Sequence, residues 1–324
     1  MTAAAPPLLV LGVRRSGTTL LRVMLDRNSR LAIPDESYFL PQLAARHRGS
    51  IDVASFVDDL RRIGTLADWG VDPERVRERL RDGMRTGDAI AAVFETYAAE
   101  RHKERWGDKT PMYMQYLPLL EELFPRAQFV HLVRDGRDVA SSFLAMPEGV
   151  VTRTWAHPRS VPDFACEWRT EVEAARGLGA RVGPERYLEV RYDDLVAEPH
   201  SALGAICSFA GLSYEAEMVR HTEDVAASSR PHQQSLKRPL TPGIRNWRSE
   251  MAPVDAAGFE DVAGELLAAL GYDLATGPAR PPSLRARARL ASYRARGWAW
   301  RAAGTAVQRS PLWQRRHPVP AGRS

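Results

Sequence analysis

The stretch Gly12-Val-Arg-Arg-Ser-Gly-Thr-Thr19 decides the fold of this chain. It overlaps the apolar run Pro7-Leu-Leu-Val-Leu-Gly-Val13, which predicts a buried strand of a parallel sheet. A helix is predicted from about Thr18 to Asn28, because leucine and methionine side chains recur there at helical spacing. A glycine loop between a strand and a helix is typical of phosphate binding, since backbone N–H groups and the helix dipole attract the anion.

The loop differs at one position from those that bind nucleoside triphosphates. Its two glycines have the spacing G-x-x-x-x-G, but Thr18 stands where those loops have the lysine that contacts the β- and γ-phosphates. This difference argues against ATP or GTP hydrolysis. Arg15 can instead supply a positive charge to a transferred group, and Thr18 and Thr19 can donate their hydroxyls at the start of the helix.

The remaining pattern predicts an α/β fold with a P-loop and a doubly wound parallel sheet. Two further strands are expected at Gln128–Val133 and Tyr187–Val190, with helices between them and after them. Helical periodicity with many charged residues predicts a helical insertion over residues 51–103. Two irregular stretches, 147–162 and 226–245, leave two interpretations open, a lid over the ligand or a plain surface loop.

The charge of the chain is divided unevenly. The whole sequence has a formal net charge of +5, yet residues 274–324 contain eleven arginines and no lysine or acidic residue. Residues 1–273 therefore hold 34 basic and 40 acidic residues, a net charge of −6. We predict a folded domain over 1–273 and a basic amphipathic, helical tail over 274–324.

Two segments resemble the sulfotransferases that use 3′-phosphoadenosine 5′-phosphosulfate (PAPS) as donor. Arg15-Ser-Gly-Thr-Thr-Leu-Leu21 is similar to their 5′-phosphosulfate loop, and Phe129-Val-His-Leu-Val-Arg-Asp-Gly-Arg-Asp-Val-Ala-Ser-Ser142 to their 3′-phosphate element. The resemblance implies transfer of a sulfuryl group from PAPS to a hydroxyl acceptor. It also implies these donor-binding residues: Arg14, Arg15, Ser16, Gly17, Thr18, Thr19, Arg134 and Ser142.

Three more segments extend the resemblance over residues 8 to 272. Trp106-Gly-Asp-Lys-Thr-Pro111 implies Lys109 as a positive charge at the transferred group, next to the one that Arg15 supplies. Val190-Arg-Tyr-Asp-Asp-Leu195 implies that Tyr192 contacts the adenine. Gly243-Ile-Arg-Asn-Trp-Arg-Ser-Glu250 implies that Arg245 closes over the 3′-phosphate.

The resemblance also implies a catalytic base. Pro34-Asp-Glu-Ser37 lies where the protein-tyrosine sulfotransferases and some bacterial relatives carry a glutamate, which implies Glu36, with Asp35 as the alternative. The cytosolic branch of the family uses a histidine after the lysine segment, and no histidine occurs between Lys109 and Phe129. The weaker alternatives are His131, His102 and Asp108. No cluster of residues has metal-ligand spacing, so no metal is expected.

The tail and the compartment complete the expectations. Six residues recur on one helical face, with arginines beside them, which suits an anionic membrane surface; they are Leu284, Ala288, Ala291, Ala295, Trp298 and Ala302. Three alternatives stay open: a tail that guides an anionic glycan or lipid acceptor toward the site, a helix docked on the acidic domain, and a disordered extension. Nucleic-acid binding is not expected. The N-terminus lacks the pattern of a secretory signal, which predicts a cytoplasmic protein. If the tail binds the membrane, the protein is expected at the inner face of that membrane. Cys166 and Cys207 are expected to be free thiols.

Two alternatives to a PAPS-dependent sulfotransferase stay open at this point. One is a P-loop kinase that uses ATP, and the other is a non-enzymatic protein that binds membranes peripherally. The sequence does not identify the acceptor, which leaves carbohydrate, lipid, peptide tyrosine and small metabolites as classes, and it does not predict the oligomeric state.

Overall fold

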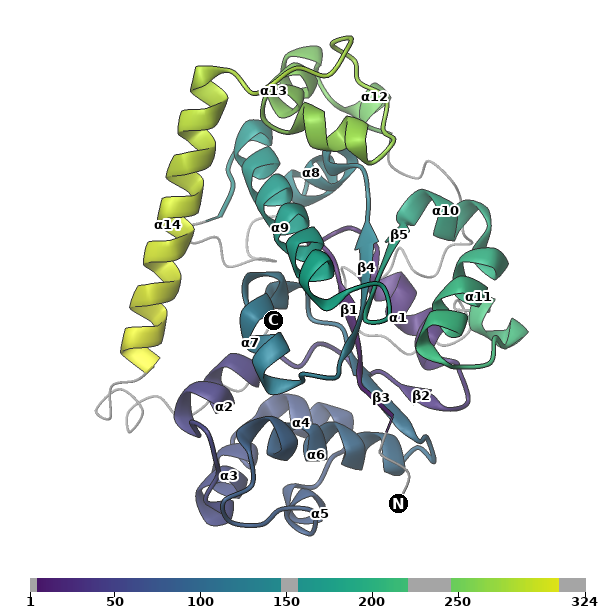
Figure 1. Ribbon diagram of the computed structural model, residues 1–324, viewed down its shortest axis with the longest axis vertical. Helices are drawn as coiled ribbons and strands as arrows, with labels where there is room; N and C mark the ends of the chain where they lie inside the picture. The colour runs from purple at the N-terminus through teal and green to yellow at the C-terminus, as the bar shows by residue number, and fades with distance from the viewer. Residues whose placement is uncertain (1–4, 147–156, 221–245, 309–324) are drawn as a thin grey trace.

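A computed structural model describes residues 5–146, 157–220 and 246–308 of the chain, without the side chains of 301 and 304–308. Its centre is a five-stranded parallel sheet with the strand order β2-β3-β1-β4-β5 (Figure 1). The strands are β1 (Leu8–Leu11), β2 (Leu31–Ala32), β3 (Arg105–Asp108), β4 (Gln128–Val133) and β5 (Tyr187–Arg191). The predicted doubly wound P-loop sheet is confirmed.

Helices surround the sheet. Those before β4 are α1 (Thr18–Asp26), α2 (Leu40–Arg46), α3 (Val53–Leu60), α4 (Gly64–Trp69), α5 (Pro73–Arg77), α6 (Thr86–Ala99) and α7 (Leu117–Leu123). Those after β4 are α8 (Gly136–Leu144), α9 (Val161–Val182), α10 (Tyr192–Ala197), α11 (Pro199–Ala210), α12 (Trp247–Glu250), α13 (Pro253–Ala269) and α14 (Leu284–Gln308). Two short 3-10 helices, η1 (Pro111–Gln115) and η2 (Ala216–Val219), complete the chain that the structure describes.

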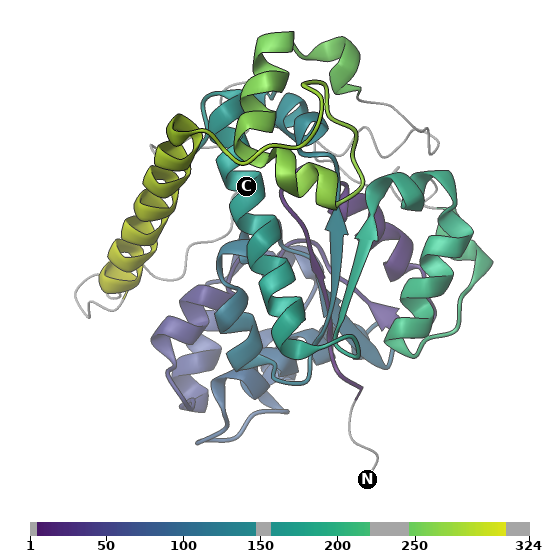
Figure 2. The same cartoon turned by 45° about the horizontal axis from the view of Figure 1, so that its top comes forward.

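Strand β1 lies in the middle of the sheet because all its side chains are apolar and can be buried on both faces. It pairs with β3 on one side and with β4 on the other. Leu8 and Val10 belong to the apolar cluster beside α1, α10 and α11, whereas Leu9 and Leu11 face the cluster formed by α2 to α7 and part of α9. Figure 2 shows α10 and α11 on the opposite side of the sheet from α9.

The helical insertion expected over residues 51–103 is confirmed as α3 to α6, which gather at one end of the molecule (Figure 1). The two irregular stretches that we interpreted as lid or surface loop fall largely on residues 147–156 and 221–245, which lie outside the described residues. Strands β2 and β3 and helix α10 are additions that the sequence pattern did not predict.

The C-terminal helix α14 lies along α9 and extends toward α2 (Figure 1). A third apolar cluster joins α8, α9, α13 and the first half of α14, and it buries Ala286 and Leu290. The described part of the tail is therefore helical and docked on the rest of the chain. The division of the chain at residue 273 stays a prediction.

Candidate active site

The phosphate loop connects β1 to α1 at the carboxyl edge of the sheet. Gly17 has a left-handed backbone with φ 94°, and a side chain there would lie 2.5 Å from the ring of Tyr192. A side chain at Gly12 would lie 2.9 Å from the carbonyl oxygen of Leu132. Arg15 is also left-handed, with φ 71°. Left-handed residues in such loops form concave sites that bind anions through backbone N–H groups.

The hydroxyl-bearing and charged side chains of the loop gather around this turn. Ser16 is buried, and its Oγ has no hydrogen-bond partner among the described residues, so it can donate to a bound anion. Arg15 Nε donates to Ser142 Oγ over 3.2 Å, which joins the loop to helix α8. Sequence reasoning placed Arg15 at the transferred group and Ser142 at the 3′-phosphate of one donor, and the structure brings the two side chains together.

Arg14 lies differently from the other loop residues. Its guanidinium is 2.8 Å from a carboxylate oxygen of the buried Glu167 on α9 and stacks on the ring of Phe143. Burial raises the pKa of Glu167, although the charge of Arg14 acts in the other direction. The side chain of Arg14 therefore anchors the loop to α9, and its backbone is what remains for donor binding.

Lys109 and Glu36 form a partly buried ion pair beside the loop. Lys109 follows β3, is only 1% exposed and contacts the carboxylate of Glu36. Its Nζ also donates to Thr19 Oγ1, the first-turn hydroxyl of α1, over 3.1 Å. Burial lowers the pKa of Lys109, although the carboxylate of Glu36 opposes that shift. A positive charge, a carboxylate and the phosphate loop thus meet at the carboxyl edge of the sheet.

A hydrogen-bonded group that sequence reasoning missed holds Glu36 in place. The next residue, Ser37, donates to Asp108 over 2.7 Å and bonds Tyr113 over the same distance. Tyr38 donates its hydroxyl to the second carboxylate oxygen of Glu36. The available signal was the hydroxyl residues flanking Glu36 and Lys109, which are Ser37, Tyr38 and Thr110.

The alternatives to Glu36 have other partners or surroundings. Asp35 makes an ion pair with Arg22 over 3.0 Å. His131 is buried in β4, where it bonds Tyr187 over 2.7 Å, and burial lowers its pKa. His102 is exposed and precedes β3, so it lies near the amino end of the strand whose carboxyl end leads to Lys109. Asp108 is buried and accepts a hydrogen bond from Ser37.

Asp108 predicts a measurable pH dependence of stability. Burial raises the pKa of its carboxyl from 3.8 to about 7, so the folded state binds this proton more tightly than the unfolded state. The group therefore destabilises the fold increasingly as the pH rises between these two values. We expect Asp108→Asn to gain stability relative to the original protein, on the order of 3 kcal/mol more at about pH 7 than at pH 4.

Urea unfolding across this pH range measures that difference. Asp58→Asn, which removes an exposed carboxylate from α3, is the control for the loss of one acidic group. If the free energies of unfolding of Asp108→Asn and the original protein differ by the same amount from pH 4 to about 7, the pKa of Asp108 is not raised by burial and the prediction is wrong.

The second phosphate candidate, Arg134, leaves β4 at the same edge of the sheet. Its guanidinium lies over the ring of Tyr192 at 4.3 Å, and its Nη2 is 3.7 Å from Asp138. Its Nε is buried with no hydrogen-bond partner among the described residues. Because Tyr192 also covers Gly17, its ring connects the phosphate loop with Arg134. The guanidinium thus keeps donor capacity for an anion.

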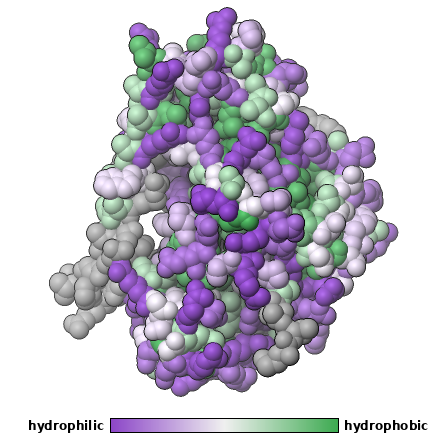
Figure 3. Space-filling view, viewed as in Figure 1, coloured by the Kyte–Doolittle hydropathy of each residue, from purple (hydrophilic) through white to green (hydrophobic). Residues whose placement is uncertain are grey.

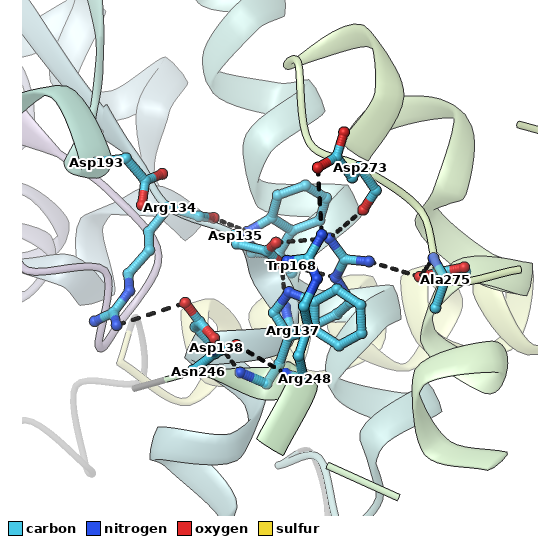
Figure 4. A network of polar contacts seen from close by, with 12 residues as sticks. Arg134, Asp135, Arg137, Asp138, Trp168, Asp193, Asn246, Arg248, Asp273 and Ala275 are labelled. Atoms are coloured by element: carbon cyan, nitrogen blue, oxygen red, sulfur yellow. Dashed lines mark hydrogen bonds and ion pairs between the residues drawn. The ribbon is translucent and has the colours of Figure 1, made fainter. Parts of the chain in front are cut away.

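Figure 4 shows that the side chains of Arg134 and the neighbouring Arg137 point to different partners. Arg137 is completely buried and donates to Asp135, Glu260 and the carbonyl oxygen of Asp273. It therefore holds α8 to the C-terminal helices, while Arg134 extends toward Asp138 on the other side. Arg245 lies outside the described residues.

Fold and site together define the class: an α/β P-loop protein with a buried lysine–carboxylate pair beside an anion-binding loop. Such a site suits group transfer from an anionic nucleotide, because the cations can stabilise charge on the transferred group. In residues 5–146, 157–220 and 246–308, three or more histidine, cysteine or acidic side chains nowhere gather as a metal site. The absence of a metal stays a prediction. No described helix combines the length and apolar character of a membrane span.

Comparison with known proteins identifies the family. The pattern described as "Sulfotransferase family" matches residues 6–216. Protein-tyrosine sulfotransferase A of Caenorhabditis elegans is 25% identical over 281 residues, which are 83% of this chain and 68% of that protein. The sulfotransferase domain of the Synechococcus PCC 7002 olefin synthase is 26% identical with a TM-score of 0.58, over 85% of this chain and 98% of that one.

A further structure supports the fold alone. The sulfotransferase domain from the curacin biosynthetic pathway is 20% identical with a TM-score of 0.59, over 83% of this chain and 99% of that one. This chain belongs to the sulfotransferase family. It is a PAPS-dependent enzyme that transfers a sulfuryl group to a hydroxyl acceptor, which confirms the resemblance and decides against the kinase and the non-enzymatic binding protein.

Proposed function

We propose that Glu36, Lys109 and Arg15 carry out the transfer and that Glu36 is the general base. The observation that carries this assignment is the contact of the buried Lys109 with the partly exposed Glu36 beside Thr19 of the phosphate loop. No other carboxylate considered from the sequence combines partial exposure with contact to this lysine: Asp35 is bound to Arg22, and Asp108 is enclosed.

Each proposed role corresponds to one part of the transfer reaction. The acceptor oxygen forms a bond to sulfur while the bond between sulfur and the phosphate oxygen of the donor breaks. The carboxylate of Glu36 takes the proton of the acceptor hydroxyl. Lys109 and Arg15 stabilise the charge on the sulfuryl and leaving oxygens. Because Lys109 contacts Glu36 directly, one side chain can orient the base and neutralise the transferred group.

The residues that we propose to bind the donor lie along the same carboxyl edge of the sheet. The loop from Arg14 to Thr19 would hold the 5′-phosphate by its backbone N–H groups, with the hydroxyls of Ser16, Thr18 and Thr19. Arg134 and Ser142 would hold the 3′-phosphate, because a guanidinium can bind a phosphate through two parallel hydrogen bonds. Tyr192 supports Arg134 in the structure, and contact with the adenine remains our proposal for its ring.

We expect adenosine 3′,5′-bisphosphate to stabilise the protein against heat by about 2.7 kcal/mol at a hundredfold excess over its dissociation constant. ATP with Mg²⁺ should stabilise it far less, because the loop lacks the lysine of triphosphate-binding loops. Differential scanning fluorimetry with both ligands checks this. Equal stabilisation by ATP would contradict the PAPS site, and so would the absence of any response to the bisphosphate.

The acceptor and the compartment are also proposals. Protein-tyrosine sulfotransferases are among the curated relatives, so a tyrosine-containing peptide is the first acceptor to assay with sulfur-labelled PAPS, followed by alcohols and carbohydrates. We propose the cytoplasm as the compartment. The two buried cysteines, Cys166 and Cys207, are free thiols as expected, which suits a reducing compartment. Cell fractionation shows in which compartment the protein is found.

A further inference from the structure

The C-terminal helix α14 has one face fixed on the body of the protein. Ala286 and Leu290 are buried in the cluster shared with α9 and α13. One helical turn further, Tyr293 donates its hydroxyl to Glu167 over 3.3 Å. Since Glu167 also holds Arg14 of the phosphate loop, this contact connects the helix with the donor site. The helix is thereby held in one orientation rather than left as a loose tail.

Two ion pairs fix the same orientation. Arg289 lies 3.3 Å from Asp163, and Arg294 lies 2.6 Å from Glu173, both on α9. Two of the six arginines in α14, which contains no acidic residue, thus pair with acidic residues of α9. Arg285 and Arg296 form no ion pair with the described residues that the structure records.

The opposite face of α14 is apolar and points to solvent. Leu284 is 83% exposed and Trp298 is 69% exposed, and the alanines between them are exposed as well. These residues are the stripe that the sequence pattern identified: Leu284, Ala288, Ala291, Ala295, Trp298 and Ala302. At 1.5 Å per residue, Leu284 and Trp298 stand about 21 Å apart along the helix. The docked face is a different set of residues.

Arginines border the exposed stripe on both sides. At 100° per residue, Arg285 and Arg296 fall on one side of it and Arg287 and Arg294 on the other. Figure 3 shows hydrophilic and weakly apolar residues interspersed along the edge of the molecule that α14 forms in Figure 1. An apolar stripe between two rows of positive charge is the composition of helices that lie in the interface of an anionic membrane.

We propose that the outer face of α14 binds the surface of an anionic phospholipid membrane while its inner face stays docked on α9. A nucleic acid or another polyanion would be bound by the arginines alone and would leave Leu284 and Trp298 in water. A membrane accounts for both features, because the apolar stripe enters the acyl boundary and the arginines contact the lipid phosphates. The helix then brings the sulfotransferase domain to acceptors at a membrane surface.

The test uses the full-length protein with two kinds of vesicle, phosphatidylcholine alone and phosphatidylcholine mixed with phosphatidylserine. Co-sedimentation at low salt should show binding to the mixed vesicles and little to the neutral ones. Leu284→Ser with Trp298→Ser should lower the partition coefficient by about tenfold or more, because two apolar side chains no longer enter the lipid. Each arginine removed, in Arg285→Gln or Arg296→Gln, should lower it by about fivefold.

Matched variants on the body control for the loss of apolar surface and of charge. Val254→Ser removes an apolar side chain that is 77% exposed on α13. The double variant Arg77→Gln and Arg81→Gln removes two exposed arginines near α5. Both controls should bind mixed vesicles as the original protein does. All these variants should keep sulfotransferase activity in solution, since none of the positions belongs to the proposed site.

Two results would overturn the proposal. One is a failure of the original protein to bind the mixed vesicles. The other is undiminished vesicle binding by the variant that lacks Leu284 and Trp298, which would reduce the helix to a polyanion-binding surface. Point substitutions are preferable to deletion of 274–324, because deletion also removes the buried Ala286 and Leu290 from the core.

Discussion

Glu36→Gln is expected to lower turnover by about a thousandfold, within the range of 10²–10⁴ typical of general acid–base catalysis. Glutamine keeps the size of the side chain and can still accept a hydrogen bond from Tyr38 or Lys109, which both contact Glu36 in the structure. It cannot take the proton of an acceptor hydroxyl. Binding of adenosine 3′,5′-bisphosphate should change only fewfold, because the phosphate loop and Arg134 are intact.

Asp35→Asn is the matched control, because the chain offers two adjacent carboxylates with different surroundings. Asp35 is occupied by Arg22 at 3.0 Å and does not contact Lys109 in the structure. Turnover measured with sulfur-labelled PAPS should therefore stay within a fewfold of the original rate in Asp35→Asn. Normal turnover in Glu36→Gln, or a larger loss in Asp35→Asn than in Glu36→Gln, would move the role of base to another residue.

The central strands and the loop were predictable because their physical signals are local. An apolar run that must be buried on both faces predicts β1 and β4, and glycines with no room for a side chain mark the phosphate loop. Strand β3 gives no such signal. The strand buries two charged residues whose hydrogen-bond partners lie far away in the sequence. Arg105 donates to Gln128, and Asp108 accepts a hydrogen bond from Ser37.

The surroundings of the site were less predictable than its candidate residues. Glu36 and Lys109 came from a resemblance in short segments, whereas their contact requires β3 to lie beside β2. Arg14 has a partner that the sequence did not predict. The resemblance implied a donor-binding residue, which stays a prediction; in the structure its side chain lies 2.8 Å from a buried glutamate on α9, 153 positions later. No pattern within the loop indicates such a partner.

In the tail, the periodicity of the sequence identifies an apolar helical face but does not show whether that face is buried or exposed. The sequence identified the stripe from Leu284 to Ala302 correctly as one helical face. The structure buries another set, Ala286 and Leu290, and leaves the stripe exposed. Both sides contain apolar residues, and the docked side is the one at which two arginines of α14 pair with acidic residues of α9.

Arg134→Ala is expected to weaken binding of adenosine 3′,5′-bisphosphate by about a hundredfold or more. Hydrogen bonds to charged groups contribute about 1.5–3 kcal/mol each, and 1.4 kcal/mol corresponds to a factor of ten. The guanidinium is placed for this role by its stacking on Tyr192 and by its buried Nε, which lacks a partner among the described residues. Isothermal titration calorimetry measures the loss.

The ligand itself supplies the sharper control for Arg134. Adenosine 5′-phosphate has the same ring and 5′-phosphate but no 3′-phosphate, so its affinity should fall far less in Arg134→Ala than that of the bisphosphate. The difference between the two losses is the coupling between Arg134 and the 3′-phosphate, free of any general damage to the site. Arg176→Ala, which removes a half-exposed arginine paired with Glu189, should leave both affinities unchanged. Equal losses for both nucleotides would mean that Arg134 supports the fold through Tyr192 and does not bind the 3′-phosphate.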